Sequence, residues 1–500
     1  MSEKNQSHKQ ILKSSSIIGG ASVIGIFIGL FKIKVVAVLL GPVGIGLIGL
    51  LQNIMAMAAS VAGMGLGLAG TRQIAEANAD NNQQSIARAR RALFLGTMLL
   101  AGLGGLLVWL FKEPLAITFL SDINKSKWIG WLAIGVMLTV AASSQNALLN
   151  GMRRIADLAK LQIYSSVFAT VLGISGVWLW QEEGLVIFVI SVPLVTFIIG
   201  HIYVSRLPKV VVKPTPFNEI KAEWNILLRL GFAFMAAGLA ATLGQLAIRS
   251  LVQSKLGSAD LGLFQAAWTI SMIYIGFVLA AMSADYYPRL TGVIRDREAT
   301  IRLVNEQTEI ALLLSGPVFL AMLTLAPWVL MILYTSEFTQ AAQILRWQIL
   351  GDIIKVISWP LGFTIIAMGA TKTYLLFESI VMIIFYIVTW LGLDYFGIEA
   401  TGIGFLVMYL FYLPIVYFWA RYKIGFKWDK QVKNNAITLS LTAMTINFAS
   451  SYDKWLGLIL GAILTLYFLV VNVTVLMKIG GNISLIKKFS NFFKRIKRKY

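Results

Sequence analysis

The amino-acid sequence predicts an all-α integral membrane protein with about 14 transmembrane helices, arranged as two pseudo-symmetric six-helix lobes around a central cavity plus two C-terminal helices. Three observations predict this class. Of the 500 residues, 58% are hydrophobic and only 13% are charged, and the mean hydropathy is +0.76. Apolar runs of about 18–25 residues follow one another, each long enough to cross the hydrocarbon of a bilayer. Finally, short motifs recur at a steady offset, as they do after a duplication.

The apolar runs define the individual spans. The first six lie near residues 14–33, 44–68, 92–110, 128–150, 161–180 and 185–204. Six more lie near residues 226–252, 260–284, 308–333, 343–368, 374–393 and 402–420. Two further spans lie near residues 434–450 and 455–477.

Lysine and arginine predict the orientation of these spans. Most of the 43 basic residues fall in the two tails and in alternate connections. The opposite connections hold Lys112, Lys125, Lys127, Lys255, Arg346 and Lys454. Because cytoplasmic loops carry the excess of positive charge, both termini are predicted to be cytoplasmic. The net charge of +20 is therefore explained without a nucleic-acid partner.

The sequence also contains an internal repeat. Residues 40–48 resemble residues 256–264, and residues 150–154 resemble residues 368–372. An even number of spans in each copy gives two parallel lobes related by an axis along the membrane normal, with a cleft between them. We expect an N-terminal lobe at 1–206, a cytoplasmic linker at 207–224, a C-terminal lobe at 225–424 and two extra spans at 425–480. Residues 481–500 have apolar and basic residues at helical spacing, which indicates an amphipathic helix on the anionic cytoplasmic leaflet or, alternatively, a disordered basic tail.

One predicted span carries a polar stripe. Gln348, Asp352 and Lys355 are spaced i, i+4 and i+7, so they share one face of a helix. A charge at the membrane centre costs roughly 2.5–3.5 kcal/mol, so the stripe is expected to face protein or a water-filled cavity. Alternatively, Asp352 and Lys355 neutralise each other and only hold helices together.

Charge is distributed unevenly among the spans. The first six predicted spans contain no Asp or Glu, whereas Lys32 and Lys34 lie at the outer end of the first. A net positive lining in a low dielectric attracts anions, and arginine matches phosphate as a bidentate fork. We therefore predict a substrate cavity bounded by Arg249, Lys355, Lys34, Lys32, Gln52, Gln245 and Gln348, with Asp352 and Glu378 as a charge network or coupling site. The two lysines of the first span can instead extend to the outer interface.

Several kinds of site are excluded. The sequence has no Gly-Lys pair, which excludes a P-loop, and no cysteine, which excludes disulfides and Cys-ligated metals. Gly44, Gly46 and Gly49 match a dinucleotide fingerprint only as a string, because they lie in a predicted span without a βαβ context. The two histidines have no metal-ligand partner at useful spacing. We expect no cofactor and leave H⁺ or Na⁺ open as a coupling ion.

Three stretches resemble the polysaccharide flippases of the multidrug/oligosaccharidyl-lipid/polysaccharide (MOP) exporter superfamily, in particular the O-antigen and enterobacterial-common-antigen repeat-unit translocases. They are residues 41–46, 287–290 and 347–355, and the resemblance covers roughly residues 10–424. Lys34, Arg249, Asp352, Lys355 and Glu378 fall where the enterobacterial type carries the same charges. The two extra spans are similar instead to those of the lipid II flippases.

The resemblance implies a function. A polyprenyl-diphosphate-linked oligosaccharide would pass from the cytoplasmic to the periplasmic leaflet of a bacterial inner membrane by alternating access, for the synthesis of a surface polysaccharide such as lipopolysaccharide. Membrane lipids, a polysaccharide polymerase and a chain-length regulator are the further partners it implies.

Three alternatives stay open at this point: a cation-coupled multidrug exporter, a lipid II-type flippase, and an integral membrane glycosyltransferase or polymerase. Drug export is disfavoured because cationic drugs call for buried carboxylates, which the first six spans lack. An enzyme calls for a large loop with acid and base groups. The longest outer connection, near residues 111–127, offers only Glu113 and Asp122. We therefore expect a transporter and not an enzyme.

Overall fold

The structure of the chain is a computed structural model that describes residues 3–79, 83–207 and 217–479. Helices make up these residues, which contain no β-strand, so the predicted all-α class is confirmed. Half of the predicted linker 207–224, residues 208–216, and all of the predicted tail 481–500 lie outside the described residues.

Nine stretches of the described chain are long and apolar enough to cross a membrane. The stretch Ile155–Ser205 contains two of the predicted spans, and most of two others fall within Gly20–Gly63. Helices cover nearly all of each predicted span, although the span predicted at 44–68 is divided by a turn at Met64 and Gly65 between α1 and α2. The total of about fourteen spans remains a prediction.

The chain forms two compact units. Unit 1 comprises Met1–Gln265 and Leu333–Glu337, and unit 2 comprises Ala266–Ile332 and Phe338–Tyr500. Helix α8 (Phe217–Leu256) belongs to unit 1 because it packs on α1, α2 and α3. The lobes predicted at 1–206 and 225–424 are defined by the sequence repeat, whereas the two units are defined by contacts between residues. The units therefore do not test the lobe boundaries, which remain predictions.

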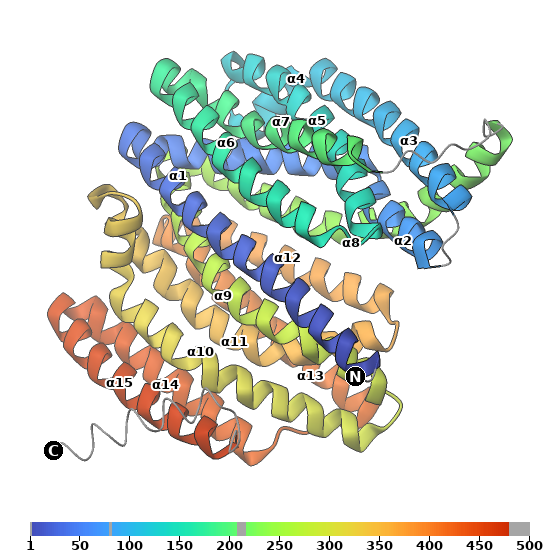
Figure 1. Ribbon diagram of the computed structural model, residues 1–500. Helices are drawn as coiled ribbons and strands as arrows, with labels where there is room; N and C mark the ends of the chain where they lie inside the picture. Colours follow the sequence, from blue (N-terminus) through green and yellow to red (C-terminus); the bar gives the residue numbers. More distant parts are fainter. Residues whose placement is uncertain (1–2, 80–82, 208–216, 480–500) are drawn as a thin grey trace, which may run out of the picture. The chain divides into compact units, whose positions relative to one another are not determined.

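In unit 1 the main helices are α1 (Glu3–Gly63), α2 (Leu66–Ala79), α3 (Gln83–Leu110), α5 (Ser126–Gly151), α6 (Ile155–Trp180), α7 (Gly184–Ser205) and α8 (Figure 1). The short α4 (Lys112–Leu115) leads into a π-helical turn at Ala116–Leu120. Helix α6 packs between α7 and α1, and α3 packs on α5. Within each helix the backbone N–H and C=O groups are bonded to one another, as a segment that crosses a membrane requires.

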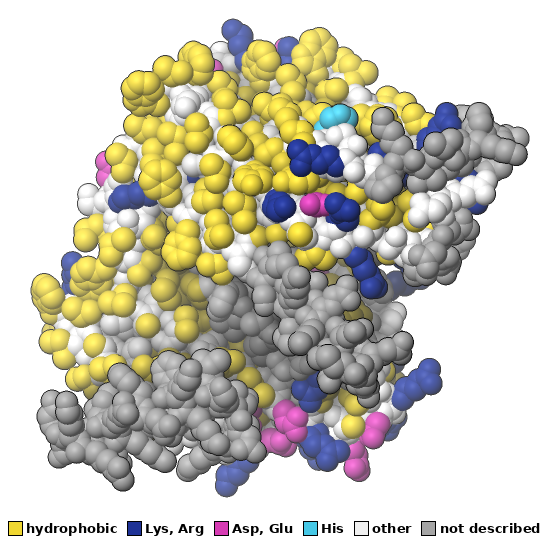
Figure 2. Space-filling view, in the orientation of Figure 1, with side chains coloured by type: hydrophobic (Ala, Val, Ile, Leu, Met, Phe, Trp, Pro, Cys, Tyr) yellow, Lys and Arg dark blue, Asp and Glu magenta, His cyan; other side chains and the backbone are white. Residues whose placement is uncertain are grey.

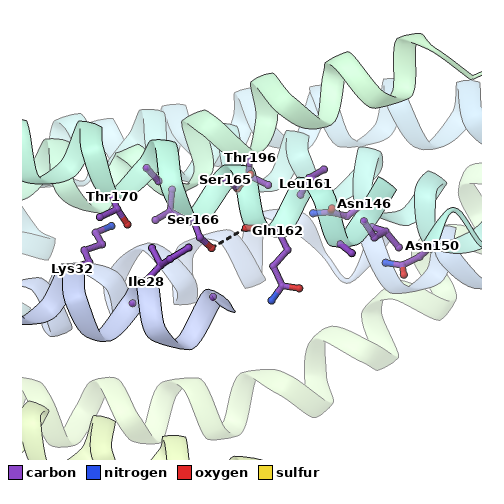
Figure 3. Close-up of a pocket in the computed structure, with 16 residues that line it drawn as sticks. Ile28, Lys32, Asn146, Asn150, Leu161, Gln162, Ser165, Ser166, Thr170 and Thr196 are labelled. Carbon is purple, nitrogen blue, oxygen red and sulfur yellow. Dashed lines mark hydrogen bonds between the residues drawn. The ribbon is translucent and has the colours of Figure 1, made fainter. Parts of the chain in front are cut away.

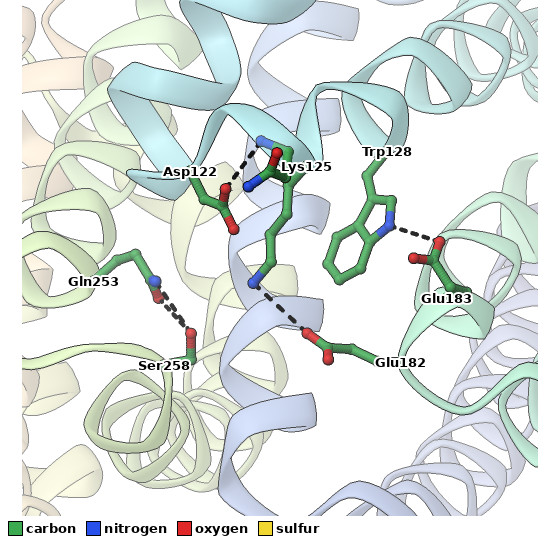
Figure 4. A network of polar contacts seen from close by, with 8 residues as sticks. Asp122, Lys125, Trp128, Glu182, Glu183, Gln253 and Ser258 are labelled. Atoms are coloured by element: carbon green, nitrogen blue, oxygen red, sulfur yellow. Dashed lines mark hydrogen bonds and ion pairs between the residues drawn. The ribbon is translucent and has the colours of Figure 1, made fainter.

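Polar contacts join the first turns of α5 and α7 in unit 1 (Figure 4). The indole nitrogen of Trp128 donates a hydrogen bond of 2.9 Å to Glu183, and Lys125 forms an ion pair of 3.6 Å with Glu182. Asp122 accepts a hydrogen bond from the backbone nitrogen of Asn124, and this bond caps the start of the short 3₁₀ turn before α5. Such charged and aromatic groups are typical of a membrane–water interface.

Unit 2 contains most of α9 (Ser258–Val293), α10 (Arg297–Leu333), a 3₁₀ turn (Ser336–Gln340), α11 (Ala341–Ala367), α12 (Thr371–Phe396), α13 (Glu399–Ile424), α14 (Lys430–Tyr452) and α15 (Lys454–Ile479). Helix α11 packs on α12, α13 and α14, and most of its residues are buried. The last two helices lie side by side (Figure 1, red). The helix that carries the predicted polar stripe is therefore at the core of unit 2.

Helix α1 is interrupted at a glycine. Gly41 has φ 60° and ψ −158°, a conformation that is essentially restricted to glycine, and Pro42 then restarts the helix. The sequence predicted a connection between two spans at this place, and in the structure two helical segments of α1 meet there at a sharp kink.

The two copies of the repeated motif pack against each other inside unit 1. A Cβ atom added to Gly46 would collide with the backbones of Ser258 and Gly262, and one added to Gly262 would collide with Pro42. The repeat aligns Gly46 with Gly262 and Pro42 with Ser258. The contact is therefore reciprocal, which is the pattern of a two-fold relation. Glycine at both positions permits this close approach of two helices.

Large apolar side chains are exposed over much of the surface. Figure 2 shows hydrophobic side chains over the helices of unit 1, with Lys and Arg in smaller groups. Phe27 is 68% exposed and Trp178 is 66% exposed, and in unit 2 Ile383 is 57% exposed. Apolar exposure of this extent is expected of a surface that faces lipid.

Candidate functional site

Asp352 is completely buried in the core of unit 2, on α11. Its Oδ2 atom accepts hydrogen bonds of 2.6 Å from the hydroxyls of Ser271 and Tyr274, both on α9. Its Oδ1 atom has no hydrogen-bond partner among the described residues. Because hydrogen bonds to a charged group contribute about 1.5–3 kcal/mol each, the two hydroxyls offset much of the cost of burying this carboxylate.

The alternative that Asp352 and Lys355 only neutralise each other is not supported by their geometry. The described part of the chain contains no ion pair between them within 4.0 Å. The hydroxyls of α9 hold Asp352, while the Lys355 ammonium lies 5.6 Å from the ring centroid of Tyr409 and 5.9 Å from that of Phe405. The two charges therefore remain close without forming a contact pair.

Lys355 lines a cavity of about 290 Å³ within unit 2. Glu378 of α12 lines the same cavity, with the hydroxyls of Tyr374 and Tyr412 within hydrogen-bonding reach of its carboxylate. Trp359 and Phe363 of α11 form another part of the wall, with their ring centroids 4.4 Å apart. The cavity thus combines one cation, one anion, hydroxyl groups and aromatic faces.

Gln348, one turn before Asp352, is completely buried. Neither polar atom of its amide has a hydrogen-bond partner in the part of the chain that the structure describes. A buried amide without partners costs about 1–3 kcal/mol. The polar stripe of α11 therefore faces protein at Gln348 and Asp352, and a cavity at Lys355.

Arg249 lies in unit 1 and is only 2% exposed. Its Nε donates to the Gln265 side chain at 3.0 Å, its Nη1 donates to the Gln245 backbone carbonyl at 3.2 Å, and the guanidinium lies 5.5 Å from the Phe264 ring centroid. Gln265 aligns with Gly49 in the repeat, and a Cβ added to Gly49 would meet that same side chain. Arg249 is thus held where the repeated motifs meet.

The remaining predicted residues of unit 1 are dispersed. Lys34 donates a hydrogen bond to the backbone carbonyl of Tyr334. Lys32 is only 8% exposed, so it does not extend to the interface, and its ammonium lies 3.9 Å from the Phe188 ring centroid. Gln52 is exposed on α1.

The structure therefore brings together Asp352, Lys355 and Glu378 in unit 2, and Arg249 with Gln245 in unit 1, whereas Lys32 and Lys34 lie apart from each other. Whether the groups of both units face one chamber remains a prediction. No cluster of His, Asp or Glu suitable for a metal ion occurs among the described residues.

Sequence reasoning missed the partners of the charged groups. Ser271 and Tyr274, which hold Asp352, are spaced i and i+3 on α9, and Tyr409 and Tyr412 have the same spacing on α13. Hydroxyl-bearing residues on one face of an apolar helix were the available signal. The signal is weak because such residues also satisfy their own helix backbone, as Thr308 and Ser315 do.

Comparisons with known proteins identify the family and the fold of this chain. Residues 11–293 match the family model described as polysaccharide biosynthesis protein. The chain is 23% identical over 376 residues to the lipid III flippases of Escherichia coli (strain K12) and Shigella flexneri, covering 74% of this chain and 88% of each relative.

Among solved structures, the lipid II flippase MurJ in an inward closed conformation matches with a TM-score of 0.71 and 15% identity, over 93% of this chain and 100% of that one. An inward-facing multidrug resistance MATE transporter of the MOP superfamily matches with a TM-score of 0.67 and 14% identity, over 80% of this chain and 94% of that one. These two likenesses show the fold. Because the family model matches more than half of its length, the chain belongs to the polysaccharide biosynthesis protein family.

Proposed function

We propose that this protein is a flippase that moves a polyprenyl-diphosphate-linked oligosaccharide from the cytoplasmic to the periplasmic leaflet of a bacterial inner membrane. One observation carries the proposal: apolar helices of unit 2 enclose a cavity lined by Lys355, Glu378 and aromatic side chains. A buried charged cavity is costly in a membrane protein and marks a path for a polar solute. Similarity to curated lipid III flippases over most of the chain supports the same substrate class.

The chemistry of the cavity suits a sugar linked to a diphosphate. Lys355 supplies a point charge for a phosphate oxygen, while Glu378 and the hydroxyls of Tyr374 and Tyr412 match sugar hydroxyls. The faces of Trp359 and Phe363 offer flat apolar surfaces for the C–H side of a pyranose ring. At about 290 Å³ the cavity holds only part of an oligosaccharide, so the remainder and the lipid lie outside it.

Arg249 provides a second cationic group for the diphosphate. Its bonds to Gln265 and Gln245 fix the guanidinium, and a fixed bidentate donor loses little entropy when it binds phosphate. Asp352 and Glu378 are the candidates for a coupling site that takes up H⁺ or Na⁺. Transport of this kind changes no covalent bond, and we assign no enzymatic step to the chain.

The proposed substrate implies further partner proteins. A polysaccharide polymerase and a chain-length regulator would receive the translocated oligosaccharide in the periplasmic leaflet. Both termini are cytoplasmic in this proposal, because basic residues are concentrated in the tails and in alternate connections.

A reconstituted transport assay tests the proposal. The full chain in proteoliposomes is expected to move a fluorescent polyprenyl-diphosphate oligosaccharide between leaflets, measured as fluorescence lost to a quencher outside. The matched control is the same lipid with the sugar attached by a neutral linker, which is expected to move at the rate of protein-free vesicles. Equal rates for the two lipids, or accumulation of a cationic dye in their place, would contradict a diphosphate-recognising flippase.

A further inference from the structure

A second cavity lies inside unit 1, between α1, α5, α6 and α7, and neither Arg249 nor Lys34 lines it (Figure 3). Its volume is about 530 Å³, which is within the range of roughly 300–1,000 Å³ that is typical of ligand pockets. The wall contains Lys32 at one end and Asn146 and Asn150 at the other, with Gln162 and Ser165 of α6 between them (Figure 3). The proposed transport function has not used this cavity.

Two of these polar side chains are more than nine-tenths buried and make no hydrogen bond with a described residue. Ser165 is 6% exposed, and its Oγ makes no hydrogen bond with any described residue. Lys32 is 8% exposed, and its contact among the described residues is the Phe188 ring. Both line the cavity, so their unused hydrogen-bonding capacity is directed toward its contents.

Lys32 also forms no ion pair with any of the residues that the structure describes. The carboxylate on α6, Asp157, forms an ion pair of 2.7 Å with Arg154, and α5 and α7 have no acidic residue. Asp157 precedes Thr170, the neighbour of Lys32 in Figure 3, by about 20 Å along the helix. A cation–π contact offsets only a small part of the free energy that is needed to remove an ammonium from water. An anion within the cavity would supply the missing compensation.

We propose that this cavity binds a carboxylate-bearing sugar residue, with the carboxylate on Lys32 and the ring hydroxyls on Ser165, Gln162 and Asn146. The amides and hydroxyls provide both donors and acceptors, as a sugar requires, whereas a simple anion site needs donors alone. Gly25 and Gly29 occupy one face of α1 beside the cavity and leave space for a ring. The inference deepens the proposed function and rests on it, because it assigns acidic oligosaccharides as the preferred substrate class.

Thiol labelling tests the charge of the cavity, because the chain has no cysteine of its own. Ser165→Cys is expected to react about tenfold faster with a negatively charged methanethiosulfonate than with a positively charged one. Lys32→Met in the same background is expected to remove this preference, and the matched change of an exposed lysine on α6, Lys160→Met, is expected to keep it. Thr170→Cys serves as a second reporter in the same cavity.

Ligand protection tests the occupant. Glucuronate at millimolar concentration is expected to slow labelling of Ser165→Cys at least threefold, while glucose and inorganic phosphate at the same concentration have smaller effects, and labelling of the exposed Ser205→Cys does not change. Equal protection by phosphate would overturn the sugar assignment. Equal rates with the two reagents, or no labelling at either position, would overturn the anion site itself.

These outcomes can be separated from failure of the proposed function. Labelling measures binding in the full chain without transport, whereas the proteoliposome assay measures transport without thiol chemistry. If lipid-linked oligosaccharide moves but glucuronate gives no protection, the acidic-sugar site is wrong and the flippase proposal stands.

Discussion

At the scale of single residues, the decisive feature is how buried charges are held. Asp352 has two short hydrogen bonds from Ser271 and Tyr274, and Lys355 faces aromatic rings and a cavity. A charge held by neutral hydroxyls keeps its field, whereas a charge in a contact ion pair loses most of it to its partner. The arrangement leaves the Lys355 ammonium available to an anionic ligand.

The role of Tyr274 gives a stability prediction. Tyr274→Phe removes one donor from the buried Asp352 carboxylate, so unfolding should become easier by about 1–3 kcal/mol. The control is Tyr287→Phe, because Tyr287 is exposed and packs on Phe363 through its ring, which phenylalanine preserves. Thermal unfolding in detergent measures both, and equal midpoints would show that the Tyr274 hydroxyl does not support Asp352.

The sequence predicted that Gln348 and Asp352 would be shielded from lipid, because exposing a polar or charged side chain to lipid costs free energy in any membrane fold. It did not predict that Ser271 and Tyr274 would donate hydrogen bonds to the Asp352 carboxylate. Hydroxyl side chains are common in membrane spans, and which of them meet across two helices depends on how each helix is rotated about its own axis. The same limitation explains why Lys32 and Lys34, two residues apart in sequence, have different surroundings. Residues that far apart on a helix point about 200° apart.

At the scale of helices, the repeated motifs determine how two segments of unit 1 meet. Gly46 and Gly262 occupy equivalent positions in the repeat, and each leaves no space for a side chain against the backbone of the opposite copy. Backbone atoms move less readily than side chains, so a methyl group at either position forces the helices apart. The reciprocity predicts that substitutions at the two positions act alike.

Alanine variants test that expectation. Gly46→Ala and Gly262→Ala are each expected to destabilise the protein by about 1–3 kcal/mol, because overpacking is costly. Gly102→Ala on α3 is the control, since an added Cβ there has no neighbour within 4 Å and alanine favours a helix. If the three variants unfold at the same temperature, the close approach of the two motifs is not present in the protein.

Helix boundaries were partly predictable. The predicted spans are almost entirely helical because hydrophobic runs of bilayer length permit little else, and only the span at 44–68 is interrupted by a turn, at Met64 and Gly65. The sequence Gly41-Pro42 was compatible with either a loop or a kink, since both need the same backbone freedom. The inclusion of α8 in unit 1 was not predictable, because it depends on packing against α1, α2 and α3 rather than on its own pattern.

At the scale of the whole molecule, the distribution of basic residues and the internal repeat carry the account. Cationic groups occur in both compact units, Arg249 in unit 1 and Lys355 in unit 2. The extra helices α14 and α15 are part of the likeness to the lipid II flippase fold, since a match over 93% of this chain must include part of them.

The predicted orientation can be tested with reporters. Green fluorescent protein fused after Tyr500 is expected to fluoresce, and alkaline phosphatase fused there is expected to be inactive, because the C-terminus is predicted to be cytoplasmic. Fusions after Asp453, between α14 and α15, are expected to give the reverse result. The opposite pattern at both positions would mean that the chain is inserted the other way round.

The most direct test of the central claim is the transport rate of variants that lack one cation. In proteoliposomes Lys355→Ala and Arg249→Ala are each expected to lower translocation of a polyprenyl-diphosphate oligosaccharide by about 100-fold, as loss of a buried charge contact does. The exposed Arg421→Ala and Lys423→Ala on α13 are expected to transport normally, with thermal unfolding measured in parallel for all four variants. Normal rates for both Lys355→Ala and Arg249→Ala would contradict recognition of the diphosphate by these two residues.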